Sequence, residues 1–212
     1  MKKFMAAVAA AAALATSGAA LAQVAASNAD KTFTIQKPAK WPNIEEQKIP
    51  GAQYREYVVG PGSEECWIRE IPRAQTAANT IMDINHSWTS PLAPDKWVLL
   101  TKDNRLMGGV STVKESAVNT AGDFPIQTAV LQGKEQEVYA ALQARPGVEF
   151  WTFCTAYENA AARKAALQEI STSLTTAKDA EYKAQVEAAK AAAAAAAAAE
   201  AEKGDKGKKK KD

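Results

Sequence analysis

The single histidine of this chain is the starting point for any catalytic chemistry. His86 lies three residues after Asp83 and directly before Ser87. An imidazole that contacts both a hydroxyl and a carboxylate can act as a general base, with the carboxylate as the orienting group. Such an arrangement depends on geometry, and Asp83 and His86 can equally interact on the surface of one helix. His86 is therefore the candidate catalytic residue, and the enzyme it would serve is a small secreted hydrolase.

No other motif in the sequence indicates catalysis or a cofactor. Gly108-Gly109 is typical of a turn and lacks the pattern of a phosphate-binding loop. The haem-attachment motif, the nucleophile elbow and the zincin motif are all missing from the sequence. The two cysteines have neither CxxC spacing nor paired histidines, so they do not predict a metal site. We therefore expect a non-enzymatic protein with no metal and no cofactor.

The first 22 residues have the pattern of a secretory signal peptide. Two lysines follow Met1, residues 4–15 are apolar, and Ala20-Leu21-Ala22 places small residues at positions −3 and −1. We predict cleavage between Ala22 and Gln23 and a periplasmic or secreted mature chain. An uncleaved anchor would need about 20 apolar residues, which this run does not reach. No second apolar span follows, so the mature chain is expected to have no transmembrane span.

Export changes the interpretation of the two cysteines, Cys66 and Cys154. In an oxidising compartment, two cysteines in one domain favour a disulfide. The bridge would close a loop of about 90 residues, for which the chain-entropy relation gives roughly 4–5 kcal/mol of stabilisation. Two buried free thiols, or one reactive cysteine, are the alternatives.

Composition divides the rest of the chain into four segments. Residues 23–30 are small and polar and are expected to be a disordered leader. Residues 31–174 contain all five tryptophans and all nine prolines and are expected to form the globular domain. Residues 175–203 are alanine-rich and lack Trp, Phe, Pro and Leu, so they predict a helical extension without a core of its own. Residues 204–212 are expected to be a disordered basic tail.

Hydrophobic periodicity within the domain predicts the element order β-β-β-α-α-β-β-β-β-α. The expected strands and helices lie at 33–37, 54–59, 66–71, 77–88, 94–100, 110–118, 126–131, 138–144, 148–154 and from 159 onward. Turn sequences such as Arg145-Pro146-Gly147-Val148 link most strands as hairpins, so the sheet should be mainly antiparallel. The predicted fold class is α+β, a mainly antiparallel sheet packed with helices and followed by an Ala-rich helical extension.

Parts of the domain resemble known proteins. The opening Phe33-Thr34-Ile35-Gln36-Lys37-Pro38 and Trp41-Pro42, followed by this element order, resembles the Mog1/PsbP-like α+β domains. Phe124-Pro125-Ile126-Gln127, with Arg145-Pro146-Gly147 and Cys154, resembles uncharacterised secreted proteins of Caulobacter-type alphaproteobacteria. The resemblance covers roughly 33–174. Because Mog1/PsbP-like domains are mostly binding and assembly modules, it implies adaptor work without an active site, and it assigns no functional residue.

The tail contains nine consecutive alanines, Ala191 to Ala199. Alanine has the highest helix propensity, so the helix could run on from the last helix of the domain, from Asn159 to Lys203, over about 45 residues and 67 Å. Large residues at coiled-coil positions do not continue beyond Ala177. We expect a single solvated helix or a fraying spacer, and the alternatives are a partner-bound helix, a coiled coil or a close-packed alanine bundle.

Four consecutive lysines lie just before the last residue of the chain: Lys208, Lys209, Lys210 and Lys211. They can be a solvated end that favours the helix C-terminus through its dipole. They can also contact an anionic surface, which in a periplasm means lipopolysaccharide, anionic phospholipid or a cell-wall polymer. The formal net charge of the whole chain is only +2, so nucleic acid is not an expected partner.

These observations lead to a functional hypothesis and two alternatives. The chain is expected to be a periplasmic or envelope-associated, non-enzymatic binding or adaptor module. Its domain would contact an unknown protein or envelope component, and its tail would give reach or surface contact. The alternatives are the small hydrolase that uses His86 and a ligand-binding domain with an apolar pocket between the sheet and the helices.

Overall fold

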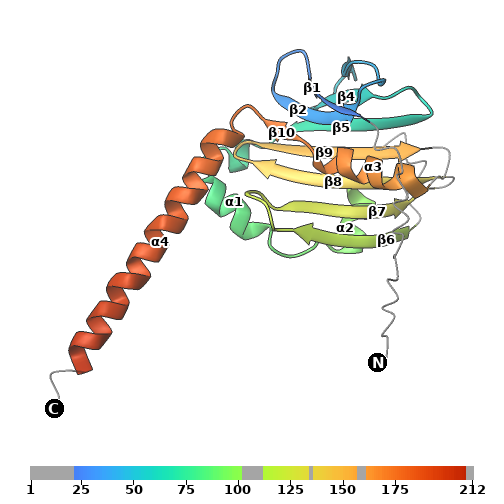
Figure 1. The fold of residues 1–212 in the computed structure, drawn as a ribbon. Coiled ribbons are helices and arrows are strands. Elements are labelled where there is room, and N and C mark those ends of the chain that lie inside the picture. Colours follow the sequence, from blue (N-terminus) through green and yellow to red (C-terminus); the bar gives the residue numbers. More distant parts are fainter. Residues whose placement is uncertain (1–21, 102–111, 134–135, 157–160, 209–212) are drawn as a thin grey trace, which may run out of the picture.

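Seven antiparallel strands form the main sheet. The computed structural model describes residues 22–101, 112–133, 136–156 and 161–208. The strands are β3 (Glu45–Gln47), β4 (Arg55–Val59), β5 (Glu64–Pro72), β6 (Thr112–Asn119), β7 (Ile126–Gln132), β8 (Glu137–Arg145) and β9 (Val148–Ala156). They lie in the order β3-β4-β5-β9-β8-β7-β6 (Figure 1). Each hairpin expected from the turn sequences is present, including the one at Gly147, whose φ of 80° suits glycine.

The predicted disulfide is confirmed and lies in the middle of this sheet. β5 and β9 are neighbours, and their register places Cys66 directly opposite Cys154. The two Cα atoms are 4.0 Å apart, and the sulfur atoms are bonded. The bond joins residues 88 positions apart in the sequence, so it connects the first half of the sheet to the second.

One face of the main sheet is covered by a small sheet and a helix. The small sheet has the order β1 (Gln23–Ser27), β2 (Phe33–Pro38), β10 (Thr175–Thr176), and the helix is α3 (Ala161–Thr172). Phe33 and Ile35 of β2 and Leu167 and Ile170 of α3 are fully or almost fully buried in one core cluster, together with Cys66 and Cys154. Their alternate and i, i+3 spacings are the ones that the sequence pattern predicts.

Helices cover the opposite face. After a short 3-10 turn (η1, Ala74–Thr76), α1 (Ile81–Ser87) and α2 (Pro94–Thr101) follow each other along the chain. Trp97 of α2 is fully buried against Leu131, Leu142 and Phe153, and its indole N–H donates to Ser116 Oγ at 3.0 Å. The molecule therefore has three layers, and the predicted α+β class with a mainly antiparallel sheet is confirmed.

Two expectations near the beginning of the domain were wrong. Residues 23–30 do not form a disordered leader, because β1 pairs with β2 over five residues. Unpaired edge groups of β2 provide the hydrogen bonds that this small, polar segment needs, and its composition alone does not show that. The first helix begins at Ile81, with Thr80 as its N-cap, instead of at residue 77.

The tail also differs from a helix continuous with the domain. α3 ends at Thr172, and β10 pairs with β2 before α4 (Asp179–Lys208) begins. Ser173 Oγ accepts the Gln36 N–H at 3.0 Å, which ties this break to β2. α4 then continues through Gly204 and Gly207 to Lys208, so residues 204–208 are not part of a disordered tail as expected. A glycine costs a helix only about 1 kcal/mol relative to alanine.

α4 leaves the body of the molecule as a long straight element (Figure 1). From Glu187 to Glu200 nearly every residue is exposed. In the described residues, no helix combines the length and the apolar character needed to cross a bilayer.

Candidate functional site

The surroundings of His86 do not form a catalytic arrangement. His86 is exposed in the last turn of α1. The Asp83 carboxylate instead accepts hydrogen bonds from the Thr80 hydroxyl at 2.8 Å and the Thr80 N–H at 2.9 Å, which lower the pKa of Asp83. Ser87 Oγ donates to the Ile84 carbonyl at 2.9 Å. Among the described residues, no hydrogen bond joins His86 to Asp83 or to Ser87. The contacts that the hydrolase hypothesis requires are therefore not formed between these three residues.

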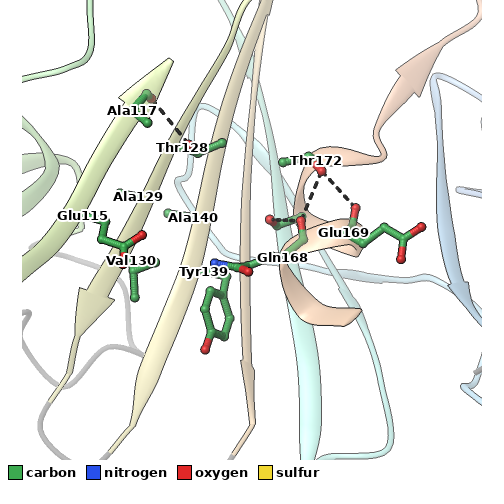
Figure 2. A pocket seen from close by; sticks show the side chains of 11 residues that line it. Glu115, Ala117, Thr128, Ala129, Val130, Tyr139, Ala140, Gln168, Glu169 and Thr172 are labelled. Atoms are coloured by element: carbon green, nitrogen blue, oxygen red, sulfur yellow. Dashed lines mark hydrogen bonds between the residues drawn. The ribbon is translucent and has the colours of Figure 1, made fainter. Parts of the chain in front are cut away.

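A groove of about 300 Å³ lies on the main sheet beside α3, and we call it the sheet groove (Figure 2). It exists because α3 packs on β8 and β9 and leaves the same face of β6 and β7 uncovered. Small or apolar side chains form much of its floor, among them Ala117, Thr128 and Val130. Gln168 reaches from α3 toward Tyr139, whereas Glu169 points away and accepts a hydrogen bond from Gln23 of β1.

The polar groups of the sheet groove centre on Tyr139 and the carboxylate beside it. The Tyr139 hydroxyl donates to Glu137 Oε2 at 3.1 Å, and Lys114 forms an ion pair with the same carboxylate. Burial, with the neighbouring Glu137 carboxylate, raises the pKa of Tyr139, so the phenol stays neutral at physiological pH. Glu115 lines the groove without a hydrogen bond or ion pair among the described residues. The described lining contains no nucleophile paired with a base.

A buried ion pair fixes the first turn of α4 to the sheet, and we call it the tail anchor. Arg145 at the end of β8 is 2% exposed, and it donates to Asp179 through Nε at 2.8 Å and Nη2 at 3.0 Å. The guanidinium also lies over the Phe124 ring, with its central carbon 3.9 Å from the centroid. The Thr176 hydroxyl donates to the same carboxylate at 2.6 Å. This fork geometry fixes both the position and the direction of α4.

Apolar contacts extend the tail anchor by two turns. Tyr182 and Val186 are buried against Ile81 and Ile84 of α1 and Ala144 of β8. Their i, i+4 spacing places both side chains on one face of α4. The i, i+4 spacing of Tyr182 and Val186 is visible in the sequence. The sequence does not show that these side chains pack on α1, or that Arg145 pairs with the start of α4.

The remaining predicted site residues stay outside both the groove and the tail anchor. Ala22 and Gln23, the expected cleavage position, are the first two described residues, and Gln23 begins β1. The signal peptide itself lies outside the described residues. Lys208 is the last residue of α4, and Lys209, Lys210 and Lys211 lie outside the described residues. Within the described ranges, no group of three or more His, Cys, Asp or Glu could hold a metal ion.

Comparison with known proteins gives similarity of structure only. No known protein family and no curated protein matches the sequence. The solution structure of cyanobacterial PsbP (CyanoP) from Synechocystis sp. PCC 6803 is similar at 10% identity, covering 74% of this chain and 93% of that one, with a TM-score of 0.48. A crystal structure from Bacteroides thetaiotaomicron VPI-5482 is similar at 13% identity, covering 70% and 46%, with a TM-score of 0.35. PsbP is the group that the sequence resembles, but this likeness assigns no role to any residue, and no match supports the Caulobacter-type resemblance.

Proposed function

We propose that this chain is an exported, non-enzymatic binding or adaptor module of the periplasm or cell envelope. The domain makes the specific contact, and α4 carries the lysine end toward an anionic surface. The observation that carries this proposal is the tail anchor, which holds one end of an otherwise exposed helix in a defined direction. A loosely attached solvated tail would need no buried ion pair.

The geometry of α4 supports a role in reach. The helix is anchored from Asp179 to Val186 and continues for 22 residues to Lys208, which spans about 33 Å at 1.5 Å per residue. Its exposed alanines provide helix propensity without large side chains for a coiled-coil seam. The disulfide supports export, because such bonds persist mainly in oxidising compartments.

Vesicle binding by the mature chain, residues 23–212, tests the proposal. Sedimentation with phosphatidylglycerol vesicles should exceed sedimentation with phosphatidylcholine vesicles and should fall as salt is added. Replacing Lys209, Lys210 and Lys211 by Gln should weaken the free energy of binding to the phosphatidylglycerol vesicles by about 1 kcal/mol per lysine. The matched control replaces Lys40, Lys48 and Lys96, which lie on the domain, by Gln.

The proposed surface contact is overturned if the tail variant and the control variant bind these vesicles equally. A parallel measurement with lipopolysaccharide micelles separates a preference for that headgroup from a general attraction to anionic lipid. Export is tested independently by the N-terminal residue of the protein recovered from the periplasm, which should be Gln23.

The sheet groove favours a second candidate function, a ligand-binding domain. Its volume of about 300 Å³ lies at the lower end of the range of small-molecule sites, about 300–1,000 Å³. An apolar neutral dye such as Nile red should gain fluorescence with the wild type, and Ala117→Trp should suppress the gain by filling the groove. Equal fluorescence with the two proteins would exclude the groove as the dye site.

A further inference from the structure

A second cleft, of about 370 Å³, lies where α4 joins the domain, and we call it the tail-root cleft. The turn before β2 forms one wall, and the junction of β10 and α4 forms the other. Pro146, Val148 and Phe150 from the β8–β9 hairpin supply an apolar surface between them. Segments from both ends of the chain therefore meet around one cavity.

Most charged groups of this cleft already have partners. Asp30 forms an ion pair with Arg55 at 2.6 Å. Glu70 accepts hydrogen bonds from the Thr32 and Tyr57 hydroxyls, both at 3.1 Å. The remaining buried charge, Arg145, is neutralised by Asp179 in the tail anchor. Neither of the two carboxylates that line the cleft is free to attract a cation.

Three donor groups that line the cleft have no such partner. Lys31 and Lys178 form no ion pair or side-chain hydrogen bond with the described residues. Tyr182 is 7% exposed, and its hydroxyl likewise has no hydrogen-bond partner in the described part of the chain. The buried side-chain atoms without a hydrogen bond do not include this hydroxyl, so it is open to the cleft and can donate to a ligand there.

The backbone holds one of these donors in an unusual conformation. Lys31 has φ = 55°, and it is the one non-glycine residue with positive φ among the described residues. Its N–H donates to the Asn28 carbonyl at 3.0 Å, and the Asn28 side chain is itself bonded to Phe33 N–H and to Tyr57 Oη. A lysine with left-handed backbone angles is higher in conformational energy than one in the helical or extended regions. Residues in this conformation concentrate at ligand sites.

We propose that the tail-root cleft binds a small monocarboxylate with an apolar or aromatic body. The carboxylate accepts charge-assisted hydrogen bonds from Lys31 and Lys178 and a hydrogen bond from the Tyr182 hydroxyl. The apolar body lies on Pro146, Val148 and Phe150. Lys31 belongs to the β1–β2 turn, whereas the other two donors lie at the start of α4. A bound carboxylate therefore bridges the two and stabilises the docked position of the tail.

Three probes of nearly equal shape and different charge test this site: phenylacetate, phenylacetamide and phenethylamine. Binding is followed by backbone amide chemical shifts of the disulfide-bonded mature protein. Phenylacetate should bind saturably and shift the amides of residues 30–32 and 176–182. Phenylacetamide should bind at least about tenfold more weakly, and phenethylamine should not compete. No saturable binding of phenylacetate, or equal affinity for its amide, overturns the proposal.

Variants assign the binding to the three donors. Lys31→Gln with Lys178→Gln should weaken phenylacetate binding at least about tenfold. Tyr182→Phe, which retains the packed ring, should weaken it severalfold. The matched control, Lys40→Gln with Lys48→Gln, should leave the affinity unchanged. Equal affinity of the first double variant and the control overturns the proposal. All these variants retain Lys208 to Lys211, so vesicle binding is measured separately and fails or succeeds independently of the cleft.

Discussion

Arg145 carries a positive charge in a place that water hardly reaches. Its cost of desolvation is offset by a carboxylate in fork geometry, by the Gln143 and Ala144 oxygens and by the Phe124 ring. The partner carboxylate, Asp179, lies 34 positions further along the chain and is the first residue of α4. One buried arginine therefore determines where the tail helix attaches.

Removing the Asp179 carboxylate should strongly lower the free energy of unfolding. Asp179→Ala leaves the buried guanidinium unpaired, and we expect a loss of about 3–5 kcal/mol in the free energy of unfolding. Lys183→Ala breaks the more exposed ion pair with Asp123, at 3.1 Å, and should cost no more than about 1 kcal/mol. Urea denaturation of both variants measures the difference. Equal losses would show that the ion pair does not hold the tail.

The same pair predicts an acid dependence. Burial raises the pKa of Asp179, but hydrogen bonds and the charge of Arg145 outweigh it, and the pKa ends below its ordinary value of 3.8. A lowered pKa contributes stability that is fully present above 3.8 and is lost as the pH falls through the folded value. The stability difference between wild type and Asp179→Asn should therefore shrink below pH 3.8 and stay constant near neutral pH. A stability difference that stays constant from neutral pH to below pH 3.8 would contradict a lowered pKa of Asp179.

The roles of single residues were predictable from the sequence where they depend on neighbouring residues or on the redox state of the compartment. The Cys66–Cys154 bond was expected from two cysteines together with a predicted export signal, and the structure confirms the bond. The tail anchor was not predictable, because the partner of Arg145 depends on how a helix docks. The same holds for Tyr182, whose free hydroxyl matters only because Lys31 lies across the cleft.

At the scale of elements, strands joined by informative turns were predicted well. β5, β8 and β9 have nine residues each, and all three, like the five-residue β4, carry β-branched or aromatic residues and flank Gly-Pro or Pro-Gly turns. The strands that sequence reasoning missed, β1, β3 and β10, are short or made of small and polar residues. They exist because a neighbouring strand supplies their hydrogen bonds, which local propensity does not describe.

The β4–β5 hairpin makes a prediction about its two glycines. Gly60 has φ = 135°, and a Cβ there would lie 2.1 Å from the Glu64 carbonyl oxygen, so Gly60→Ala should cost about 2 kcal/mol or more. Gly62 has φ = 88° with no atom within 4 Å of such a Cβ, so Gly62→Ala should cost only about 1 kcal/mol. Thermal unfolding of the two variants compares them. A larger loss at Gly62 would contradict the close approach of Gly60 to the Glu64 backbone.

At the scale of the whole molecule, cavities form where elements distant in sequence fail to cover one another. The sheet groove is open because α3 covers β8 and β9 but not β6 and β7. The tail-root cleft is open where the β1–β2 turn, a hairpin and the start of α4 meet without filling the space. Periodicity predicted the layers, but it does not specify how wide each covering element is, so neither cavity could be placed from the sequence.

The tail anchor also changes where the stable unit of the chain ends. Composition placed that boundary at residue 174, but Tyr182 and Val186 fill a core cluster with Ile81 and Ile84. A chain of residues 23–187 should therefore keep the unfolding free energy of residues 23–212, because it loses only exposed helix. A chain that ends at Lys178 lacks Asp179 and both apolar side chains, and it should lose about 3–5 kcal/mol from the unpaired arginine alone. Urea denaturation of both truncated proteins measures the boundary, and equal stability would place it back at residue 174.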